Sequence, residues 1–576
     1  MSLRLACRRL GHPRTTWPHA STPARTLVTL PRPVVSSPRL FRAGLVAAGV
    51  LTTSLVLGSV WPLHADAPVA EAEKASERPQ KPLSSLVRSY VVYSMCSVPA
   101  LVDWAPAILK TLTAIPGFKQ ITEAIVRATF FNHFVGGDTA EDCIPLLEQL
   151  RAEGKGCLFA YSVEVDEAEA AGSSKERATA AKETVRQIFE ETLHCIDVAA
   201  NFEDIHASSA DSVKGRKTWV AIKLTAMVPC PETLHNFSKY LVATRPTSSP
   251  AILFPGQPHP SDLDVLTLSR ASKEALSQED VADLAQLCDD LRAICTKAKE
   301  RGVKIIMDAE YSWYQPAVDA FLLSLQREFN ALPRRSSWFG KPPTQVTIQP
   351  VIYQTYQAYL RRTPEYLKQS IAVARAEGYA LGAKLVRGAY HPHELAAHAS
   401  SAASSLEGFG DASGLGISPD PEPPVWITKA ETDVCYDACA ALLLDEVRKD
   451  VKREVPSVAV LFGTHNWKSV DGILEGMARR GLARREGGVL EVTEEVAERV
   501  AMGQLYGMSD ALSDSIVERT HCSSPFLLKY IPYGALSEVM PYLSRRAIEN
   551  KSVLGNGAAA EERKRAGELI WKRLSG

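Results

Sequence analysis

The sequence of 576 residues lacks the cysteine patterns that mark metal sites and disulfide frameworks. Its eleven cysteines include no Cys-x-x-Cys pair and no cluster with histidine, although zinc sites and redox motifs require such spacings. We expect Cys435 and Cys439, four residues apart on a predicted helix, to be buried thiols in a reducing compartment. The formal net charge is −1, so the composition offers no electrostatic basis for nucleic-acid binding.

Several catalytic signatures are absent as well. No Gly-x-Gly-x-x-Gly follows a predicted strand, which argues against a dinucleotide-binding fold. The sequence shows no catalytic pair of carboxylates, no nucleophile elbow and no metal-ligand spacing. We therefore expect no metal, and a redox cofactor that carries the difficult chemistry is the natural inference.

The first 65 residues contain no Asp or Glu but eight arginines, spread among Ser, Thr and Pro. This composition is typical of a mitochondrial presequence, which we place at residues 1–42. The uncharged run 43–61 would form roughly 28 Å of helix, close to the ~30 Å hydrocarbon core of a bilayer. It is interpreted either as a membrane anchor or as part of the presequence. Residues 62–85 are predicted to be a linker.

Downstream, the helical spacing of apolar residues predicts a helical arm over 86–135. Short β-rich runs then alternate with helices through residues 136–550. Apolar strands separated by helices indicate a parallel sheet covered on both faces, and eight such units favour an α/β fold of the (βα)8 TIM-like barrel type over a doubly wound open sheet. The predicted strands are 157–163, 218–224, 303–308, 346–349, 381–386, 458–462, 501–505 and 528–531, and the predicted helices include 178–200, 279–301, 363–378, 431–453 and 467–481.

Two segments interrupt this alternation, and both are predicted to be long surface insertions. They are residues 242–262 and the Ser-, Ala-, Gly- and Pro-rich segment 398–424. The second follows the fifth predicted strand, where its low complexity favours disorder over an active-site lid. Residues 551–576 are predicted to form a charged C-terminal helical tail that faces solvent or a partner.

Chemistry in such a barrel lies at the C-terminal ends of the strands. Lys223 lies in an apolar strand, where a cation needs an anionic partner, and Asp308 is either that partner or a structural carboxylate. Gly388 and Ala389 follow the fifth strand and let a ligand approach the backbone closely. The other polar residues predicted at the mouth are Gln349, Lys384, Arg387, Tyr390, Thr464 and His465.

A tyrosine and two arginines share one face of a predicted helix after the eighth strand. Tyr542, Arg545 and Arg546 stand at i, i+3 and i+4, and adjacent guanidiniums offer planar bidentate donors to a carboxylate. An arginine pair alone is more often a solvated helix face, but its position beside the mouth favours a carboxylate site. The mouth is cationic as a whole, which suits a phosphate-bearing cofactor and a carboxylate substrate.

Six motifs, taken together and in this order, resemble proline dehydrogenases (proline oxidases) of the mitochondrial, eukaryotic type over about residues 130–550. The resemblance implies a distorted (βα)8 barrel holding non-covalent FAD. It implies oxidation of L-proline to Δ1-pyrroline-5-carboxylate, the first step of proline catabolism to glutamate, with electrons passed to ubiquinone. The implied location is the mitochondrion, at the inner membrane or its matrix side. The motifs are Ile222-Lys-Leu-Thr-Ala226, Met307-Asp-Ala-Glu310, Lys384-Leu-Val-Arg-Gly-Ala-Tyr390, Gly463-Thr-His-Asn466, Gly503-Gln-Leu-Tyr-Gly-Met508 and Tyr542-Leu-Ser-Arg-Arg546.

The same resemblance assigns roles to residues. Asp308, Lys384 and Tyr390 would be catalytic. Lys384 stands where bacterial members place an arginine near the flavin. A lysine at this position keeps the positive charge but lacks the bidentate fork of an arginine. The implied substrate-binding residues are Lys223, Leu385, Tyr533, Tyr542, Arg545 and Arg546. The implied cofactor-binding residues are Gln349, Lys384, Arg387, Gly388, Ala389, Thr464 and His465.

Three other interpretations stay open on the sequence alone. Oxidation of trans-4-hydroxy-L-proline would need room and a polar partner near ring C4, and crowding of the ring by Tyr533 argues for proline. A phosphate-binding barrel lyase would use Lys223 as a Schiff-base lysine. A membrane-tethered scaffold without chemistry is disfavoured, because every motif position is chemically competent.

Overall fold

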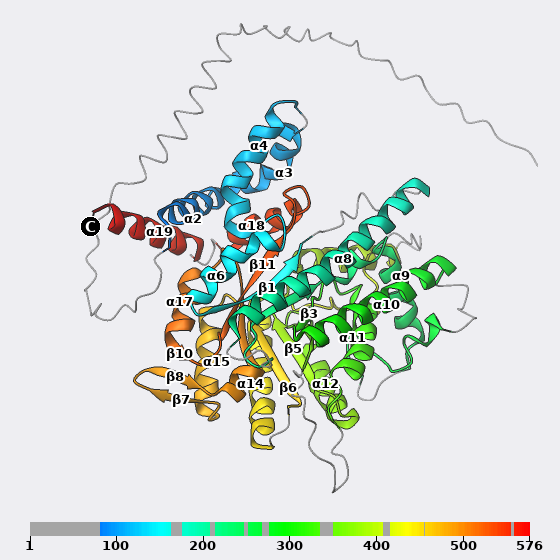
Figure 1. The fold of residues 1–576 in the computed structure, drawn as a ribbon. Helices are drawn as coiled ribbons and strands as arrows, with labels where there is room; N and C mark the ends of the chain where they lie inside the picture. The colour runs from blue at the N-terminus through cyan, green and yellow to red at the C-terminus, as the bar shows by residue number, and fades with distance from the viewer. Residues whose placement is uncertain are drawn as a thin grey trace, which may run out of the picture. The chain divides into compact units, whose positions relative to one another are not determined.

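Eight parallel strands close into a barrel in the computed structural model (Figure 1). The structure describes residues 81–113, 115–162, 175–207, 213–246, 251–267, 276–333, 350–406, 415–453, 456–553 and 558–575. The predicted presequence and the apolar run 43–61 lie outside these residues, as does all but the end of the predicted linker.

The barrel has the strand order β1–β11–β9–β6–β5–β4–β3–β2, with β2 paired to β1 to close the ring. The predicted (βα)8 barrel is therefore confirmed. A separate small sheet joins β10, β8 and β7. The barrel strands are β1 (Lys155–Tyr161), β2 (Thr218–Ile222), β3 (Ile305–Met307), β4 (Ile352–Gln357), β5 (Leu381–Val386), β6 (Val458–Gly463), β9 (Val500–Leu505) and β11 (Leu527–Tyr533), and the others are β7 (Ala483–Glu486), β8 (Val489–Val492) and β10 (Thr520–His521).

The fourth strand was predicted at the wrong place. The structure has β4 at Ile352–Gln357, whereas the predicted strand 346–349 lies outside the described residues. The sequence of β4, Ile-Tyr-Gln-Thr-Tyr-Gln, mixes apolar and polar side chains, and all six are buried. A continuous apolar run was the wrong criterion here, because the polar side chains of β4 bond to neighbouring parts of the fold. Thr355 Oγ1, for example, donates to the carbonyl of Met307 over 2.7 Å.

Helices follow most strands, and their ends carry recognisable sequence signals. Helix α10 begins with a capping box between Ser277 and Asp280 and ends at Gly302, which adopts the left-handed conformation. The helices that accompany the barrel are α6 (Ile144–Ala152), α8 (Lys175–His206), α9 (Glu232–Thr244), α10 (Gln278–Arg301), α11 (Gln315–Phe329), α12 (Thr363–Glu377), α13 (His391–Leu406), α14 (Lys429–Arg453), α15 (Trp467–Arg479), α16 (Glu494–Arg499), α17 (Asp510–Arg519) and the short turns η2 (Glu141–Cys143), η3 (Leu224–Met227) and η4 (Asp264–Leu266).

The chain ends of the described part pack together beside the barrel. The arm consists of α2 (Leu83–Cys96), α3 (Pro99–Thr113), α4 (Phe118–Val126), the π-helical turn η1 (Arg127–Phe131) and α5 (Asn132–Phe134). Helix α18 (Met540–Val553), which follows the last strand, packs against α2 and α3, and helix α19 (Ala558–Ser575) packs along α2 (Figure 1). The C-terminal helix therefore contacts the rest of its own chain and is not simply a solvated tail.

The segments predicted to be insertions are partly helical. Residues 242–244 end α9, and residues 398–406 are the last part of α13, while 407–414 lie outside the described residues. The ten described cysteines are free thiols, with Cys435 and Cys439 buried as predicted. Among the described helices, none combines the length and the apolar character needed to cross a bilayer.

Alternation along the strands divides the core into an inner and an outer part. Trp219, Ile306 and Tyr353 belong to a cluster of residues that fills the barrel interior. Their neighbours in sequence, such as Val220 and Ile305, pack outward against the helices. Successive side chains of a strand point to opposite sides, so a residue an even number of positions from an interior residue also faces the interior. This rule, here called parity, fixes which residue near the end of each strand faces the mouth of the barrel.

Candidate functional site

The inner face of the strands carries three of the predicted mouth residues. Ala221 and Ile306 lie in the barrel interior, so Lys223 and Asp308, two positions later, follow on the inner side. In β5, Leu381, Ala383 and Leu385 pack outward, which leaves Lys384 on the inner side. Lys223 and Asp308 directly follow β2 and β3, and Lys384 lies in the second half of β5, so all three are near the C-terminal ends of the strands, where barrel enzymes place their chemistry.

Asp308 lies between a lysine and a tyrosine. Lys384 Nζ and Asp308 Oδ1 are 2.5 Å apart, and both side chains are 12% exposed. The hydroxyl of Tyr530 on β11 donates to Asp308 Oδ2 over 2.9 Å, and Lys384 Nζ lies 5.3 Å from the Tyr530 ring centroid. Strands β3, β5 and β11 are thereby linked by one buried carboxylate. Its lysine partner is Lys384, whereas the sequence had suggested Lys223.

Tyr530 is a site residue that the sequence argument missed. We expected Tyr533 to wall the substrate ring, but Tyr533 packs in the outer core against Phe159 and its hydroxyl donates to Glu191 on α8 over 2.9 Å. Leu528 lies inside the barrel, so parity along β11 puts Tyr530 on the inner side and Tyr533 on the outer. The alternation of side chains along β11, counted from an interior residue such as Leu528, was the signal that could have identified Tyr530.

One further prediction needs correction, and a second stays a prediction. Leu385, expected beside the substrate ring, is fully buried in the outer cluster that includes residues of α14 and α15. Gln349, expected at the end of the fourth strand, lies outside the described residues. The amide that ends β4 is Gln357, whose Nε2 donates to the carbonyl of Glu310 over 2.9 Å.

The predicted tyrosine and arginine pair lie on α18. Arg546 is buried and its Nη2 is 2.6 Å from Glu549 Oε1, one turn further along the helix. Its guanidinium carbon is 4.9 Å from the ring centroid of Tyr542, which is also buried. Arg545 lies with its guanidinium carbon 5.7 Å from the ring centroid of Tyr390. This contact joins α18 to the loop after β5, so the arginine helix does meet the barrel mouth.

Aromatic side chains continue from this contact. The ring centroids of Tyr390 and Tyr311 are 4.3 Å apart, and Tyr311 stacks on Trp313 at 4.3 Å with an angle of 8° between the planes. Tyr390 is nearly buried while the neighbouring Ala389 is exposed. Gly388 has a φ of +116°, and a Cβ there would lie 2.6 Å from the Tyr359 ring. A side chain at Gly388 would therefore displace the loop that carries Tyr390.

Arg387 holds the loops after β5 and β6 together. Its three nitrogens donate to Asp433 Oδ1, Thr464 Oγ1 and Ser469 Oγ over 2.7 to 2.8 Å. Its guanidinium carbon also lies 4.3 Å from the ring centroid of Tyr436. These protein contacts engage all of its nitrogens, so Arg387 fixes the position of Thr464 and the start of α15.

His465 has one engaged and one unengaged ring nitrogen. The backbone N–H of Leu505 donates to His465 Nε2 over 3.2 Å, which places the ring proton on Nδ1. Nδ1 is shielded from solvent and has no hydrogen-bond partner among the described residues. Burial, with smaller effects from the charges of Lys529 and Arg546, lowers the pKa of His465 to about 3. A neutral donor without an acceptor inside the protein is a feature expected where a ligand binds.

These features define a (βα)8 barrel with cationic side chains gathered near the C-terminal ends of its strands. The sequence matches the family model "Proline dehydrogenase" over residues 160–406 and 418–558, and the chain belongs to this family. It is an oxidoreductase of the proline dehydrogenase type. Membership of the family removes the lyase and the scaffold interpretations.

Named relatives and a solved structure are similar to the chain over most of its length. The chain is 27% identical over 587 residues to "Proline dehydrogenase 1, mitochondrial" of Caenorhabditis elegans, covering 85% of each chain. It is 28% identical over 498 residues to "Hydroxyproline dehydrogenase" of Rattus norvegicus, covering 86% of this chain and 92% of the relative. Proline utilization A from Bdellovibrio bacteriovorus, inactivated by N-propargylglycine, matches with a TM-score of 0.50 and 17% identity. That match covers 83% of this chain and 39% of the other, and it supports the fold.

The neutral state of His465 predicts a dependence of stability on pH. The unfolded chain takes up a proton below pH ~6.5, whereas the folded chain does so only near the lowered pKa of about 3. The folded state therefore loses stability as the pH falls from ~6.5 toward 3, at most about 2 kcal/mol by pH 5 for this group. We expect His465→Gln, unfolded by urea without flavin, to lose less stability between pH 7 and pH 5 than the wild type. Equal losses of stability in both proteins would show that folding does not lower the pKa of His465.

Proposed function

We propose that the protein is an FAD-dependent proline dehydrogenase that oxidises L-proline to Δ1-pyrroline-5-carboxylate and passes the electrons to ubiquinone. The observation that carries this proposal is the contact of Arg545 on α18 with Tyr390 after β5. It brings the arginine pair to the same end of the barrel as Lys384 and Asp308. A carboxylate-binding helix and a buried polar group thus meet where the family resemblance implies the substrate.

The residues at the mouth fit a flavin. His465 offers a buried N–H donor that has no acceptor among the described residues, and a flavin presents carbonyl and hydroxyl oxygens that can accept it. Lys384 and the arginines provide positive charge beside which a reduced, anionic flavin is stabilised. Bound there without a covalent bond, FAD would supply the acceptor for a hydride. Thr464, Gly388 and Ala389 are the remaining predicted contacts of the cofactor.

The protein's own residues would bind and orient the substrate. Arg545 and Arg546 would bind the proline carboxylate together with Lys223, since two guanidiniums and an ammonium are charge-assisted donors. In the structure Glu549 engages Arg546, so substrate binding would compete with this ion pair. Tyr390 and Tyr542 would bound the ring. Orientation of this kind can supply several kcal/mol of a reaction barrier.

Asp308 and Tyr530 bear on the choice between proline and hydroxyproline. The relatives include enzymes named for both substrates. Tyr530 is held by Asp308 on the inner side of β11, and its ring is the one that would crowd a hydroxyl at ring C4. We therefore propose proline as the preferred substrate, because Tyr530, and not Tyr533 as the sequence had suggested, would crowd the ring near C4.

An exposed apolar surface supports a location at a membrane. The helical hairpin of α3 and α4 exposes large apolar side chains, each between 37% and 66%. Three on each helix stand at i, i+3 and i+7, which gives both helices an apolar outer face, and contiguous apolar patches mark interaction surfaces. Because α3 packs on α18, a bilayer bound here would lie next to the arginine helix. The side chains are Val98, Leu101, Trp104, Ile108, Ile115, Phe118, Ile121 and Ile125.

This surface, the predicted presequence and the names of several relatives favour the mitochondrion as the location. The proposed acceptor, ubiquinone, resides in the inner membrane, so a bilayer contact beside α18 would bring the enzyme to its acceptor. We propose that the enzyme works at the inner membrane or its matrix side.

The first test of the proposed function is the absorption spectrum of the purified protein. We expect a flavin spectrum that bleaches on addition of L-proline without oxygen, because proline would reduce the flavin. Under the same conditions trans-4-hydroxy-L-proline should bleach it more slowly. A protein that takes up no flavin, even when supplied with FAD, would contradict the proposal. Faster bleaching by hydroxyproline would contradict the choice of substrate.

The arginine pair predicts a defect in substrate binding. Arg545→Met or Arg546→Met should raise the KM for proline while the protein keeps its flavin. A lost charge-assisted hydrogen bond weakens binding by about 1.5–3 kcal/mol, roughly 10- to 150-fold. Steady-state kinetics with an artificial electron acceptor, together with the flavin-to-protein ratio, measure the two effects. An unchanged KM in both variants would show that the arginines bind something other than the carboxylate.

The hairpin predicts binding to lipid vesicles. We expect the wild type to sediment with vesicles that contain anionic lipid and ubiquinone, and Trp104→Glu with Ile121→Glu to stay in solution. Bleaching by proline should be unchanged, since the hairpin's outer face is not part of the proposed site. Ile205→Glu on α8 is the control, because Ile205 is 78% exposed and lies outside the arm. Vesicle binding that survives the double change, or a dimer that it disrupts instead, would contradict the assignment.

A further inference from the structure

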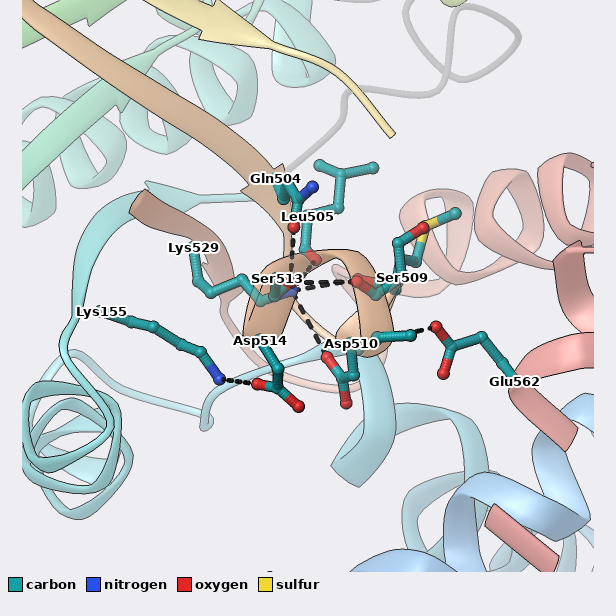
Figure 2. Close-up of polar contacts among 12 residues, drawn as sticks. Lys155, Gln504, Leu505, Ser509, Asp510, Ser513, Asp514, Lys529 and Glu562 are labelled. Atoms are coloured by element: carbon teal, nitrogen blue, oxygen red, sulfur yellow. Dashed lines mark hydrogen bonds and ion pairs between the residues drawn. The ribbon is translucent and has the colours of Figure 1, made fainter. Parts of the chain in front are cut away.

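A buried lysine holds the loop between β9 and α17 (Figure 2). Lys529, on the outer side of β11, donates from Nζ to the carbonyls of Met508 and Leu505 over 3.0 and 3.3 Å. It also lies 3.4 Å from Asp510 Oδ1. Its side chain is 2% exposed, so these groups replace the water that a lysine would otherwise bind.

Neutralisation of Asp510 does not by itself explain Lys529. Asp510 already has a closer cation, since Lys81 Nζ lies 2.6 Å from its Oδ2. Burial alone would raise the pKa of Asp510, but the charges of Lys81 and Lys529 hold it well below its usual value. Burial lowers the pKa of Lys529 itself to about 8. The lysine is thus kept buried although its charge is disfavoured, and its shorter contacts are to the two loop carbonyls.

The end of β9, directly before the loop that Lys529 holds, makes two contacts to the candidate cofactor residues. The N–H of Leu505 donates to His465 Nε2 over 3.2 Å, and Gln504 Nε2 donates to the carbonyl of Thr464 over 3.2 Å. Ser513, in the second turn of α17, donates from its hydroxyl to Gln504 Oε1 over 2.5 Å. Lys529 and Ser513, here called the brace, therefore hold the two residues that hold Thr464 and His465.

The loop has little freedom to take another position. Gly507 has a φ of +73°, and a Cβ at this residue would lie 2.2 Å from the carbonyl oxygen of His133. The hydroxyl of Tyr93 on α2 donates to the carbonyl of Gly507 over 2.9 Å. The loop is thus enclosed by the arm on one side and by the brace on the other. A close-packed loop of this kind transmits a change at Lys529 to Leu505.

We propose that the brace is a positioning device for the cofactor, which sets the tautomer of His465 through the N–H of Leu505 and the location of Thr464 through Gln504. The proposal rests on the proposed function, because it assumes that His465 and Thr464 contact the flavin. Without the Leu505 N–H at Nε2, the ring proton is free to move from Nδ1 to Nε2, and Nδ1 then has no hydrogen to donate.

The test compares two lysines of the same charge cluster. Lys529→Met removes the bonds to the loop, whereas Lys155→Met removes an equally buried charge that pairs with Asp514 and Glu153 and makes none of these bonds to the loop. We expect Lys529→Met to raise the Kd for FAD about 3- to 10-fold, the range for one or two lost hydrogen bonds, and Lys155→Met to leave it within about 2-fold. Quenching of flavin fluorescence measures the Kd. Melting temperatures of Lys529→Met and Lys155→Met are the control, because they test whether the two variants lose the same amount of stability.

A second measurement needs no flavin. Hydrogen exchange of residues 503–508 in the flavin-free protein should speed up in Lys529→Met and not in Lys155→Met, because only the first loses bonds to this loop. Lys529→Gln keeps a donor for the carbonyls and should recover most of the affinity for FAD. If Lys529→Met does not fold, Ser513→Ala tests the same device, since it removes the bonds of the Ser513 hydroxyl to Gln504 and to the carbonyl of Ser509, and we again expect a Kd raised about 3- to 10-fold.

The outcomes separate the brace from the proposed function. A wild-type protein that does not bind FAD overturns the proposed function, and the brace falls with it. FAD binding that is normal in the wild type and unchanged in Lys529→Met and Ser513→Ala overturns the brace alone. Equal losses of affinity in Lys529→Met and Lys155→Met also overturn it, because they would show a general effect of the charge cluster.

Discussion

Closure of eight strands into a barrel is the constraint on which the rest of the structure depends. In a closed ring each side chain of a strand faces either the interior or the helices, and the choice alternates along the strand. The interior is filled by Trp219, Tyr353 and their neighbours, so chemistry is confined to the open end where the strands stop. Asp308 and Tyr530 lie at this end because each follows an interior residue of its strand, Ile306 or Leu528, by two positions. Tyr533 lies an odd number of positions from Leu528 and therefore points to the outer side.

The group of Lys384, Asp308 and Tyr530 follows from this geometry. One carboxylate accepts from the side chains of two other strands, so its position is over-determined and it needs little reorganisation when a substrate arrives. A lysine meets this requirement with a single ammonium. The bidentate fork that bacterial relatives are expected to have is not needed to bind Asp308, and the positive charge at the mouth is kept. The arginine pair on α18 is a separate unit, supported by the arm and joined to the barrel at Tyr390.

Much of the fold was predictable, because seven of the eight strands are apolar runs separated by helices with clear ends. The fourth was missed because β4 carries Gln and Thr at buried positions, which composition alone assigns to a loop. For the site, the motifs indicated Lys223, Asp308 and Lys384, which lie on the inner side, but they also indicated Leu385 and Tyr533, which pack on the outer side. Leu385 and Tyr533 were chosen by analogy, whereas their orientation depends on strand parity, which needs one known interior residue. The contact of Leu505 with His465 joins the end of β9 to the loop after β6, 40 residues away in the sequence, and no local pattern in the sequence predicts it.

The two ends of the described part, at Lys81 and α19, bear on the site through α17. Arg565 of α19 pairs with Asp514 over 2.8 Å, and Glu562 accepts from the N–H of Ala511 over 3.1 Å, while Lys81 at the start of the described arm pairs with Asp510. Four cations and four acids are gathered in this cluster. Asp510 and Asp514 each pair with two of the cations, so the removal of one cation leaves each of these two acids with a partner. The side chains of the cluster come from the arm, the barrel and the last helix, and they meet at the first turns of α17. The loop before α17 holds the residues beside His465. The packing of both ends of the described part against α17 therefore supports the candidate cofactor site indirectly, through this loop.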